Sequence, residues 1–280
     1  MNNNTNNGSL DPIIKWAGGK RWLKNVIKEF YLASGKTTLC EPFAGGIAAS
    51  LHIQPKHAVI NDLNPHVINL YRQIAAGMQL NESLQNTSDD YYKNRKRFNE
   101  LAMQGIHNTP ETAQLFYYLN KSCFNGLCRF NKKGGFNVPF GNYDSVSLIR
   151  DFSQYMELFK GWDFIHGSYK DLDVGKDTFA IIDSPYDEVF SSYTVEGFNK
   201  NDQTETIEWA DDLGIPMLMT NNPTDFIMDL IIRHGFDYKI LSSRRTIAAN
   251  GDKRHKALEV IAWKGMEAPE SFVKGEMKLA

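Results

Sequence analysis

The first part of the chain alternates short apolar runs with turns and helical patterns. An apolar run at residues 38–40 is followed by a glycine-containing turn at 41–46 and by small and apolar residues at 47–51 that predict a helix. A second apolar run at 58–60 leads to an acidic residue and to a helical pattern that continues to Tyr71. Strand, glycine turn, helix, strand and acid in this order predict the opening of a nucleotide-binding α/β unit.

The pattern changes after this unit. Residues 72–118 are polar, and their spaced apolar positions predict helices. Residues 120–143 are rich in Gly, Asn, aromatic residues and Lys, which predicts a loop outside the core. The α/β rhythm then resumes in four apolar runs, at residues 164–167, 179–183, 216–220 and 257–263.

These patterns divide the chain. We expect one α/β domain at residues 11–71 and 150–265, interrupted by an insertion at 72–149. Residues 1–10 are polar and predict a disordered N-terminus, and residues 266–280 predict a loose C-terminal tail.

Composition narrows the class of protein. Hydrophobic residues make up 42% of the 280 residues, so a full core can form, and no apolar run approaches the roughly 20 residues that span a bilayer. The N-terminus lacks the basic start and apolar stretch of a signal peptide, so a cytoplasmic protein without membrane contact is expected. Cys40, Cys123 and Cys128 are too few and too badly spaced for a disulfide framework or a zinc site. We expect them to be small buried residues, and we expect no metal.

Charge is distributed unevenly along the chain. The net charge of −2 does not by itself indicate a nucleic-acid partner. Residues 121–143 carry only basic charges, residues 239–256 carry a single acid, and acids gather at 202–212. Local basic segments are typical of a one-sided phosphate-binding face, although chance clustering on a solvated surface gives the same pattern.

The turn at residues 41–46 is the first candidate site. Glycines after a strand allow the backbone to approach a ligand closely. The three spaced glycines of the dinucleotide fingerprint are absent, which disfavours a nicotinamide cofactor. Asp62, at the end of the second predicted strand, can accept both hydroxyls of a ribose. It can also cap the next helix, a role open to Asn61 and Asn64 as well.

A second candidate follows the apolar run that ends at residue 182. Asp183, Ser184, Pro185 and Tyr186 combine a carboxylate, a turn and an aromatic ring at the carboxyl end of a strand. The carboxylate and the Ser184 carbonyl can accept two hydrogen bonds from an amine, and the Tyr186 ring can stack on a base. The alternative is an Asx turn before a proline.

A third candidate lies at residues 14–20, where two glycines are bracketed by an aromatic residue and two lysines. This composition predicts a loop that closes over a polar ligand, or an ordinary turn. It is not a Walker loop, because the full spacing and the Ser or Thr after Lys20 are missing.

In combination these segments resemble the Dam-type DNA adenine methyltransferases, in which the cofactor motif precedes the target-recognition region. The resemblance covers most of the chain, and its most specific part is the DNA-recognition hairpin. The matching segments are the opening cofactor motif, the glycine loop, the ribose motif, the two parts of the hairpin and the Asp-Pro-Pro-Tyr catalytic motif, at residues 15–20, 41–46, 61–64, 119–131, 134–141 and 183–186.

The resemblance implies a Rossmann-like α/β S-adenosylmethionine methyltransferase domain with an inserted helical DNA-recognition domain that carries a β-hairpin loop. It implies direct methyl transfer from S-adenosyl-L-methionine to the exocyclic amine of adenine in double-stranded DNA, after base flipping. GATC is the recognition sequence expected of the family. The expected setting is the nucleoid of a bacterial or phage-infected cell, within a restriction–modification, phage or housekeeping pathway. The oligomeric state is left open.

Residue by residue, the resemblance implies three groups of site residues. The residues expected at the reacting amine are Asp183, Ser184, Pro185 and Tyr186. The residues expected at the cofactor are Trp16, Lys20, Phe43, Gly45, Asp62, Ser168, Tyr169 and Asp183. The residues expected on DNA are Lys15, Phe124, Asn125, Leu127, Arg129, Pro139 and Tyr143. Among the last group, Arg129 is expected to read a guanine edge.

The sequence departs from the family pattern at three places. Ser184 replaces the first proline of the catalytic motif, so the carbonyl is retained but the turn is less rigid. Ser168 replaces an acid at the segment expected to contact the adenine of the cofactor. Asn142 replaces an arginine before the last tyrosine of the hairpin, which removes a phosphate contact.

Two other interpretations stay open. A methyltransferase acting on RNA or on a protein amine could use the same catalytic device, although the DNA-type hairpin argues against it. A catalytically impaired DNA-binding or regulatory protein of the same fold is the other, suggested by Ser184 and Ser168.

Overall fold

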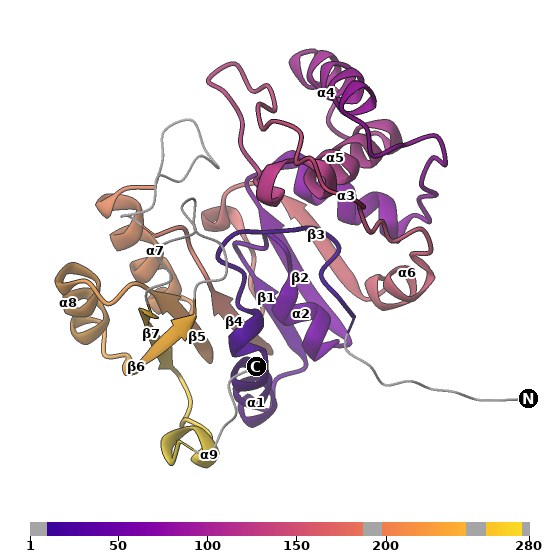
Figure 1. Cartoon of the computed structure of the whole chain (residues 1–280). Helices are drawn as coiled ribbons and strands as arrows, with labels where there is room; N and C mark the ends of the chain where they lie inside the picture. Colours follow the sequence, from indigo (N-terminus) through magenta and orange to yellow (C-terminus); the bar gives the residue numbers. More distant parts are fainter. Residues whose placement is uncertain (1–9, 187–197, 245–255, 276–280) are drawn as a thin grey trace, which may run out of the picture.

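The computed structural model describes residues 10–186, 198–244 and 256–275. Within these ranges the chain forms a seven-stranded sheet in the order β3-β2-β1-β4-β5-β7-β6, flanked by helices (Figure 1). The strand bounds are Thr38–Glu41 (β1), His57–Asp62 (β2), Trp162–His166 (β3), Thr178–Ile182 (β4), Met217–Asn221 (β5), Asp237–Arg244 (β6) and Lys256–Lys264 (β7).

The strand order is that of a doubly wound α/β sheet. β1 pairs in parallel with β2 on one side and β4 on the other, and β3 and β5 extend the parallel part. β7 is antiparallel to both β5 and β6. The predicted Rossmann-like α/β class is therefore confirmed. The order reverses between β1 and β4, and sheets of this kind bind ligands beyond the carboxyl ends of the strands at such a point.

Helices cover the sheet and build the part at the upper right of Figure 1. The α-helices are Lys24–Ser34 (α1), Ala48–Ile53 (α2), Pro65–Ala75 (α3), Ser88–Met103 (α4), Pro110–Ser122 (α5), Ser153–Phe159 (α6), Lys200–Asp212 (α7), Asp225–Arg233 (α8) and Glu270–Val273 (α9). Short 3₁₀ helices are Arg21–Leu23 (η1), Phe124–Gly126 (η2) and Tyr169–Asp171 (η3).

The central strands are buried on both faces. Successive side chains of a strand point to opposite faces, so Leu39 and Phe179 pack with α1, α3 and α5. Their neighbours Cys40 and Ala180 pack with α7 and α8 on the other side. Burial on both faces explains why β4 is continuously apolar from Phe179 to Ile182.

The predicted strands all lie in the sheet, with their ends shifted by a few residues. The helix expected to reach Tyr71 continues to Ala75. The sequence does not predict β6, because its eight residues mix charged, polar and apolar side chains and it lies at the edge of the sheet.

The helical segment shares its core with the sheet. Helix α5 packs against both α3 and α4. Tyr91 on α4 and Phe116 on α5 are fully buried in the same cluster as Leu39 of β1. The insertion at residues 72–149 is thus packed onto the α/β domain, while its boundaries stay a prediction.

Two expectations about loose segments are wrong. The loop at 120–143 is not outside the core, because Phe136 and Val138 are 1% and 0% exposed and anchor it between the helices. The C-terminal segment contains α9, whose Phe272 is buried against Phe30 and Trp263 at ring distances of 5.2 and 5.7 Å. The buried ring of Phe272 anchors this short segment to the domain. The expectation for the N-terminus concerns residues 1–10, of which residues 1–9 lie outside the described ranges.

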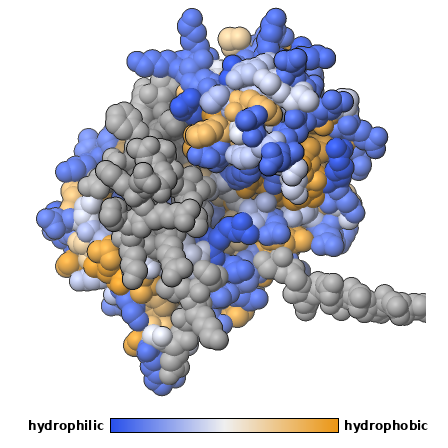
Figure 2. Space-filling view, in the orientation of Figure 1, coloured by the Kyte–Doolittle hydropathy of each residue, from blue (hydrophilic) through white to orange (hydrophobic). Residues whose placement is uncertain are grey.

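The surface and the cysteines follow ordinary patterns. No described helix is long and apolar enough to cross a bilayer. Figure 2 shows hydrophilic residues along the upper margin, over α4 and the neighbouring loop. Cys40, Cys123 and Cys128 are free and buried, as predicted.

A buried carboxylate joins β1 to α2. Glu41 is 6% exposed, and its Oε1 accepts hydrogen bonds from the backbone N–H of Ser50, at 2.9 Å, and from the Ser50 hydroxyl. Burial raises the pKa of Glu41 to about 7, although the bonds from Ser50 oppose the rise. The native state therefore holds a proton that the unfolded chain releases between pH 4.5 and 7, the ordinary and native pKa values.

We predict that Glu41→Gln is more stable than wild type at pH 8 and only slightly more stable than wild type at pH 5. Wild type loses stability as pH rises through the native pKa of Glu41, by up to about 3 kcal/mol, whereas the amide does not titrate. Urea unfolding at the two pH values measures the difference. The same pH dependence of the free energy of unfolding in both proteins would contradict the prediction.

Candidate functional site

The segment at residues 183–186 begins directly after β4, and a buried lysine binds its carboxylate. Oδ1 of Asp183 lies 2.7 Å from Lys20 Nζ and accepts a hydrogen bond from Thr220 Oγ1 at 2.8 Å. Lys20 is 6% exposed and also donates to the Gly18 carbonyl at 2.8 Å. Its Nζ lies 5.0 Å from the ring centroid of Tyr186. A loop before α1 and two neighbouring strands thus meet at one carboxylate.

The lysine is charged throughout the physiological range. Burial lowers the pKa of Lys20, but Asp183, followed by Tyr186 and Glu259, raises it, and the net pKa lies well above the usual value. Burial is also the main cause that raises the pKa of Tyr186, so its phenol stays neutral. The site therefore holds one fixed ion pair beside a neutral aromatic ring.

Helix α7 supports the next two residues of this segment. Ser184 is 4% exposed, and its hydroxyl donates to Gln203 Oε1 over a long 3.5 Å. Gln203 Nε2 donates to the Pro185 carbonyl at 2.6 Å. The serine that replaces a proline therefore binds Gln203 rather than Asp183.

The glycine turn is fastened to Asp62. Asp62 Oδ2 accepts a hydrogen bond from the Gly45 N–H, and Oδ1 accepts one from the Asn64 N–H, both at 2.8 Å. Burial raises the pKa of Asp62, although these two N–H groups oppose it. The cap of α3 is Asn64, whose side chain accepts from the His66 N–H. Of the alternatives left by the sequence, the helix cap is therefore Asn64.

Trp16 packs directly on this turn. Gly45 has a φ of 48°, and a Cβ there would lie 2.4 Å from Trp16 Nε1. Only glycine combines this backbone conformation with so close a contact. The loop at residues 14–20 therefore meets the glycine turn through Trp16 and the residues after β4 through Lys20.

An aromatic pair lies beside the turn. The rings of Phe43 and Tyr169 are 4.9 Å apart, and Tyr169 also contacts Trp209 of α7 at 5.1 Å. The Tyr169 hydroxyl accepts a hydrogen bond from Thr206 at 3.1 Å. Ser168 caps η3 by accepting from a backbone N–H, so its hydroxyl hydrogen is still available to a ligand.

The predicted hairpin is an irregular antiparallel loop. It is closed by two isolated bridges, Cys123 to Phe140 and Phe130 to Phe136. Residues 119–122, expected in the hairpin, are instead the last turn of α5. The loop sits on an aromatic base, because Phe130 stacks on buried His66 of α3 with ring centroids 5.4 Å apart.

Lys15 joins the loop at residues 14–20 to the start of the loop at residues 123–143, which we call the recognition loop because DNA recognition is predicted for it. Its backbone N–H donates to Asn120 Oδ1 at 2.8 Å, and Asn120 Nδ2 donates back to the Lys15 carbonyl at 2.9 Å. Lys15 Nζ donates to the Lys121 carbonyl at 3.0 Å and lies 4.1 Å from the ring centroid of Tyr143. Two residues predicted to contact DNA are therefore in contact with each other.

The other predicted DNA residues lie along the same loop. Phe124 is 46% exposed, and Asn125 beside it has a φ of 54°. Arg129 Nε donates to Asn137 Oδ1 at 2.7 Å, which fixes the direction of the guanidinium group. Leu127 is half-buried and Pro139 is exposed.

The two basic segments differ. Lys132 and Lys133 of the first are exposed on the recognition loop. In the second, Lys239 donates to the Phe272 carbonyl at 2.8 Å and so holds α9. Arg245, Lys253 and Arg254 lie outside the described residues.

Sequence reasoning missed four polar residues that hold the predicted ones. Thr220 and Gln203 support the segment after β4, and Asn120 and Asn137 support the recognition loop. A polar residue at the end of an apolar run could have indicated Thr220. Gln203 gives no such signal, because it lies in an acidic helix that reads as a solvated surface.

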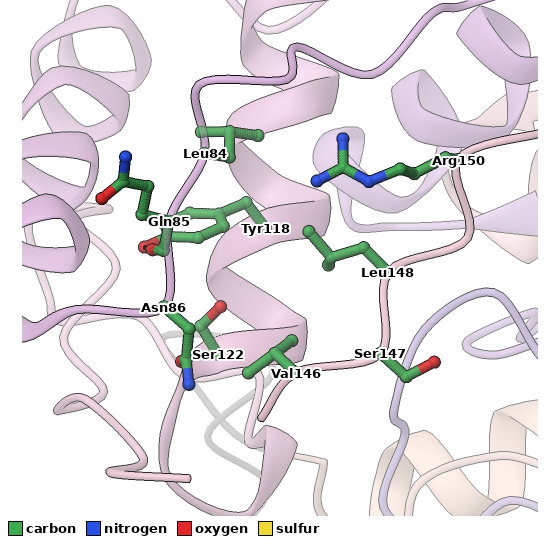
Figure 3. Close-up of a pocket in the computed structure, with 9 residues that line it drawn as sticks. All are labelled: Leu84, Gln85, Asn86, Tyr118, Ser122, Val146, Ser147, Leu148 and Arg150. Atoms are coloured by element: carbon green, nitrogen blue, oxygen red, sulfur yellow. Dashed lines mark hydrogen bonds between the residues drawn. The ribbon is translucent and has the colours of Figure 1, made fainter. Parts of the chain in front are cut away.

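A cavity of about 270 Å³ lies apart from these residues (Figure 3). It is bounded by α5 and by the segments on either side of it, with the Arg150 side chain at its edge. None of the predicted site residues lines it.

Comparison with known proteins agrees with this geometry. The sequence pattern of the family described as D12 class N6 adenine-specific DNA methyltransferase matches residues 16–247. The retron Ec67 DNA adenine methylase of Escherichia coli is 31% identical over 275 residues, which cover 91% of this chain and 92% of that protein. The DNA adenine methylase of Vibrio cholerae is 31% identical, with 89% and 94% covered. The type II methyltransferase M.CviBI of Paramecium bursaria Chlorella virus NC1A is 32% identical, with 79% and 86% covered. A family match over most of the chain, joined to a doubly wound fold, means that this chain belongs to the D12 class of N6 adenine-specific DNA methyltransferases.

Proposed function

We propose that the protein transfers a methyl group from S-adenosyl-L-methionine to the exocyclic amine of adenine within GATC in duplex DNA, by base flipping and direct transfer. The observation that carries the proposal is the convergence of Asp183, Tyr186 and the Gly45–Asp62 corner around the carboxyl ends of β1, β2 and β4. Ligands of doubly wound sheets bind at this position.

The residues around the glycine turn fit this cofactor. The Trp16 ring packs on Gly45 so closely that no Cβ is tolerated there, and Asp62 offers a carboxylate at the end of β2 for ribose hydroxyls. Phe43 and Tyr169 offer apolar ring surface for an adenine, and Trp16 closes the corner. When bound, the cofactor supplies an electrophilic methyl group on a sulfonium centre.

The catalytic step we assign to Asp183 and Ser184 is activation of the amine. The lone pair of an aromatic amine is delocalised into the ring, which makes the amine a poor nucleophile. Hydrogen bonds from the amine to the Asp183 carboxylate and the Ser184 carbonyl favour a tetrahedral nitrogen and stabilise the charge that develops on it. Both observed contacts of the carboxylate are to Oδ1, so Oδ2 faces no donor among the described residues.

The target base has to leave the duplex, at a cost of a few kcal/mol. Stacking on Tyr186 offsets part of this cost. Phe124 and Asn125, exposed at the base of the recognition loop, are suited to the gap that the base leaves.

Sequence choice is assigned to the recognition loop. Arg129, oriented by Asn137, is suited to a bidentate contact with a guanine edge. Lys15 is suited to a second guanine, and Leu127 and Pro139 to a thymine methyl. Digestion of treated DNA by restriction enzymes that differ in sensitivity to GATC methylation tests the proposed sequence.

A catalytically impaired DNA-binding protein is the second candidate, because Ser184 and Ser168 depart from the family pattern. The hydroxyl of Ser184 is directed to Gln203 and not to Asp183. Oδ1 of Asp183 binds Lys20 and Thr220, so Oδ2 stays available to the substrate, which favours an active enzyme. Transfer of labelled methyl groups to duplex DNA distinguishes the two.

We predict that Asp183→Ala lowers methylation at least about 100-fold and leaves DNA affinity nearly unchanged. The carboxylate acts mainly in the transition state, whereas DNA affinity comes mostly from phosphate contacts. Single-turnover methylation and DNA binding are measured beside Asp163→Ala, an exposed acid on β3. Retention of more than about a tenth of the turnover would exclude this role.

We predict that Asp62→Ala weakens cofactor binding more than it slows turnover at saturating cofactor. Ribose hydroxyls do not change during the reaction, so their contacts contribute equally to the ground and transition states. Calorimetry measures the affinity. An unchanged affinity would limit Asp62 to holding Gly45.

We predict that Arg129→Ala relaxes sequence choice by about 1–3 kcal/mol, seen as more methylation of near-cognate relative to cognate sites. Lys133→Ala, an exposed lysine of the same loop, should weaken all sites alike. An equal fall on cognate and near-cognate sites in Arg129→Ala would mean that the arginine binds phosphate.

A further inference from the structure

Gln203 is a completely buried amide on the first turn of α7. It is 0% exposed, and both ends of its side chain are used. Nε2 donates to the Pro185 carbonyl at 2.6 Å, and Oε1 accepts from Asn221 Nδ2 at 2.9 Å and from Ser184 Oγ at 3.5 Å. One side chain thus joins α7, the end of β5 and the middle of the 183–186 segment.

This arrangement constrains the peptide that carries Tyr186. The Pro185 carbonyl belongs to the Pro185–Tyr186 peptide group, so the bond from Gln203 fixes the plane from which Tyr186 departs. The neighbouring Ser184 lacks the fixed φ of the proline found in the family, and its hydroxyl makes only a long contact of 3.5 Å with the same amide, so the 2.6 Å bond to the Pro185 carbonyl is the main restraint. The hydrogen bonds of Gln203 thus restrain the backbone at a place where the proline ring does so in the family.

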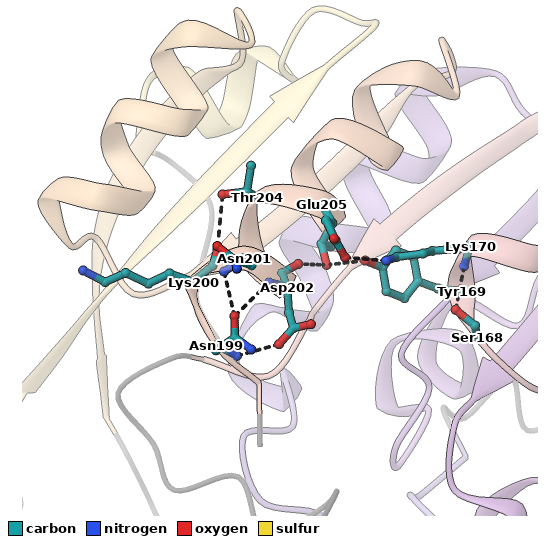
Figure 4. Close-up of polar contacts among 10 residues, drawn as sticks. Ser168, Tyr169, Lys170, Asn199, Lys200, Asn201, Asp202, Thr204 and Glu205 are labelled. Carbon is teal, nitrogen blue, oxygen red and sulfur yellow. Dashed lines mark hydrogen bonds and ion pairs between the residues drawn. The ribbon is translucent and has the colours of Figure 1, made fainter. Parts of the chain in front are cut away.

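Helix α7 is itself firmly fixed. Asn199 and Asp202 form a capping box at its start (Figure 4). Lys170 of η3 pairs with Glu205 on its exposed side (Figure 4). One turn after Gln203, Thr206 donates to the Tyr169 hydroxyl. Gln203 therefore projects from a helix whose start is capped and whose following turn is bound to η3.

We propose that Gln203 is a positioning residue for methyl transfer, which sets the direction of the Ser184 carbonyl and of the Tyr186 ring relative to the target amine. It acts through these residues and does not touch the substrate. The proposal rests on the proposed function of residues 183–186.

The first test replaces the amide by an apolar side chain of similar length, in Gln203→Met. Single-turnover methyl transfer should fall about 10- to 100-fold, because a displacement of about 1 Å at a reacting group costs up to that factor. Affinity for S-adenosyl-L-methionine and for duplex DNA should change less than about twofold, because Gln203 is not among the residues that we assign to the cofactor or to DNA. Equal losses of rate and of both affinities, or an unchanged rate, would overturn the proposal.

A matched control separates positioning from stability. Asn69 of α3 is also a buried amide, 3% exposed, and its Nδ2 donates to the Thr109 carbonyl at 2.9 Å and to Thr112 Oγ1 at 3.1 Å. Asn69→Leu should lower the unfolding temperature as Gln203→Met does but should keep the single-turnover rate. A rate loss of the same size in both variants would assign Gln203 a purely structural role.

Gln203→Glu provides a second readout, the methylation rate per folded molecule at each pH, which separates positioning from the pH-dependent stability that a buried carboxyl group also causes. Burial raises the pKa of a carboxyl group, and the protonated form can still donate to the Pro185 carbonyl, whereas the ionised form cannot. The rate of the variant relative to wild type should therefore be highest at low pH and fall as pH rises. A pH-independent ratio would contradict the proposal, even if Gln203→Met does not fold.

Asp183→Ala, measured in the same series, distinguishes this inference from the proposed function. An active Asp183→Ala refutes the proposed chemistry. An inactive Asp183→Ala together with a fully active Gln203→Met refutes only the role of Gln203.

Discussion

The parallel packing of β1 between β2 and β4 is the constraint on which the site depends. It brings three carboxyl ends to one edge of the sheet, and each end contributes a different group. β1 leads into the glycine turn, β2 ends in Asp62, and β4 leads into Asp183. The bond between Gly45 and Asp62 fastens the first two groups to each other. The corner that we assign to the cofactor and the carboxylate that we assign to catalysis are neighbours because the strands are adjacent.

Buried polar side chains give this edge its rigidity. Thr220, Gln203 and Asn221 are all at most 1% exposed, and each has a hydrogen-bond partner in or beside the segment after β4. In a region of low dielectric, a fully bonded network specifies one geometry, while a missing partner is costly. A methyl transfer that relies on positioning benefits from such an arrangement.

The recognition loop is coupled to the same core. Phe130 of this loop stacks on His66 in the first turn of α3, the helix that follows Asp62, and Asn64 Nδ2 lies 3.7 Å from the sulfur of Cys128. Asn120 binds the backbone of Lys15, which precedes Trp16 in the loop at the glycine turn. The loop to which we assign DNA recognition and the corner assigned to the cofactor therefore share their supports, which suits an enzyme that has to align both substrates.

The sequence by itself determined six of the seven strands, the glycine turn and the order of the motifs, because apolar runs and glycines reflect the local requirements of the backbone. It indicated Asp62, Asp183 and Tyr186 from their places after predicted strands, and the strand order of the structure brings these places together. Only the tertiary structure decided that Lys20 pairs with Asp183, since the two are far apart in the sequence and meet through the packing of the N-terminal loop on the sheet. It alone decided that Gln203, in an acidic helix, is buried rather than solvated, and that Phe136 and Phe272 anchor segments that look loose. Burial and pairing of such residues depend on which elements become neighbours, and the local sequence pattern does not encode which elements pack together.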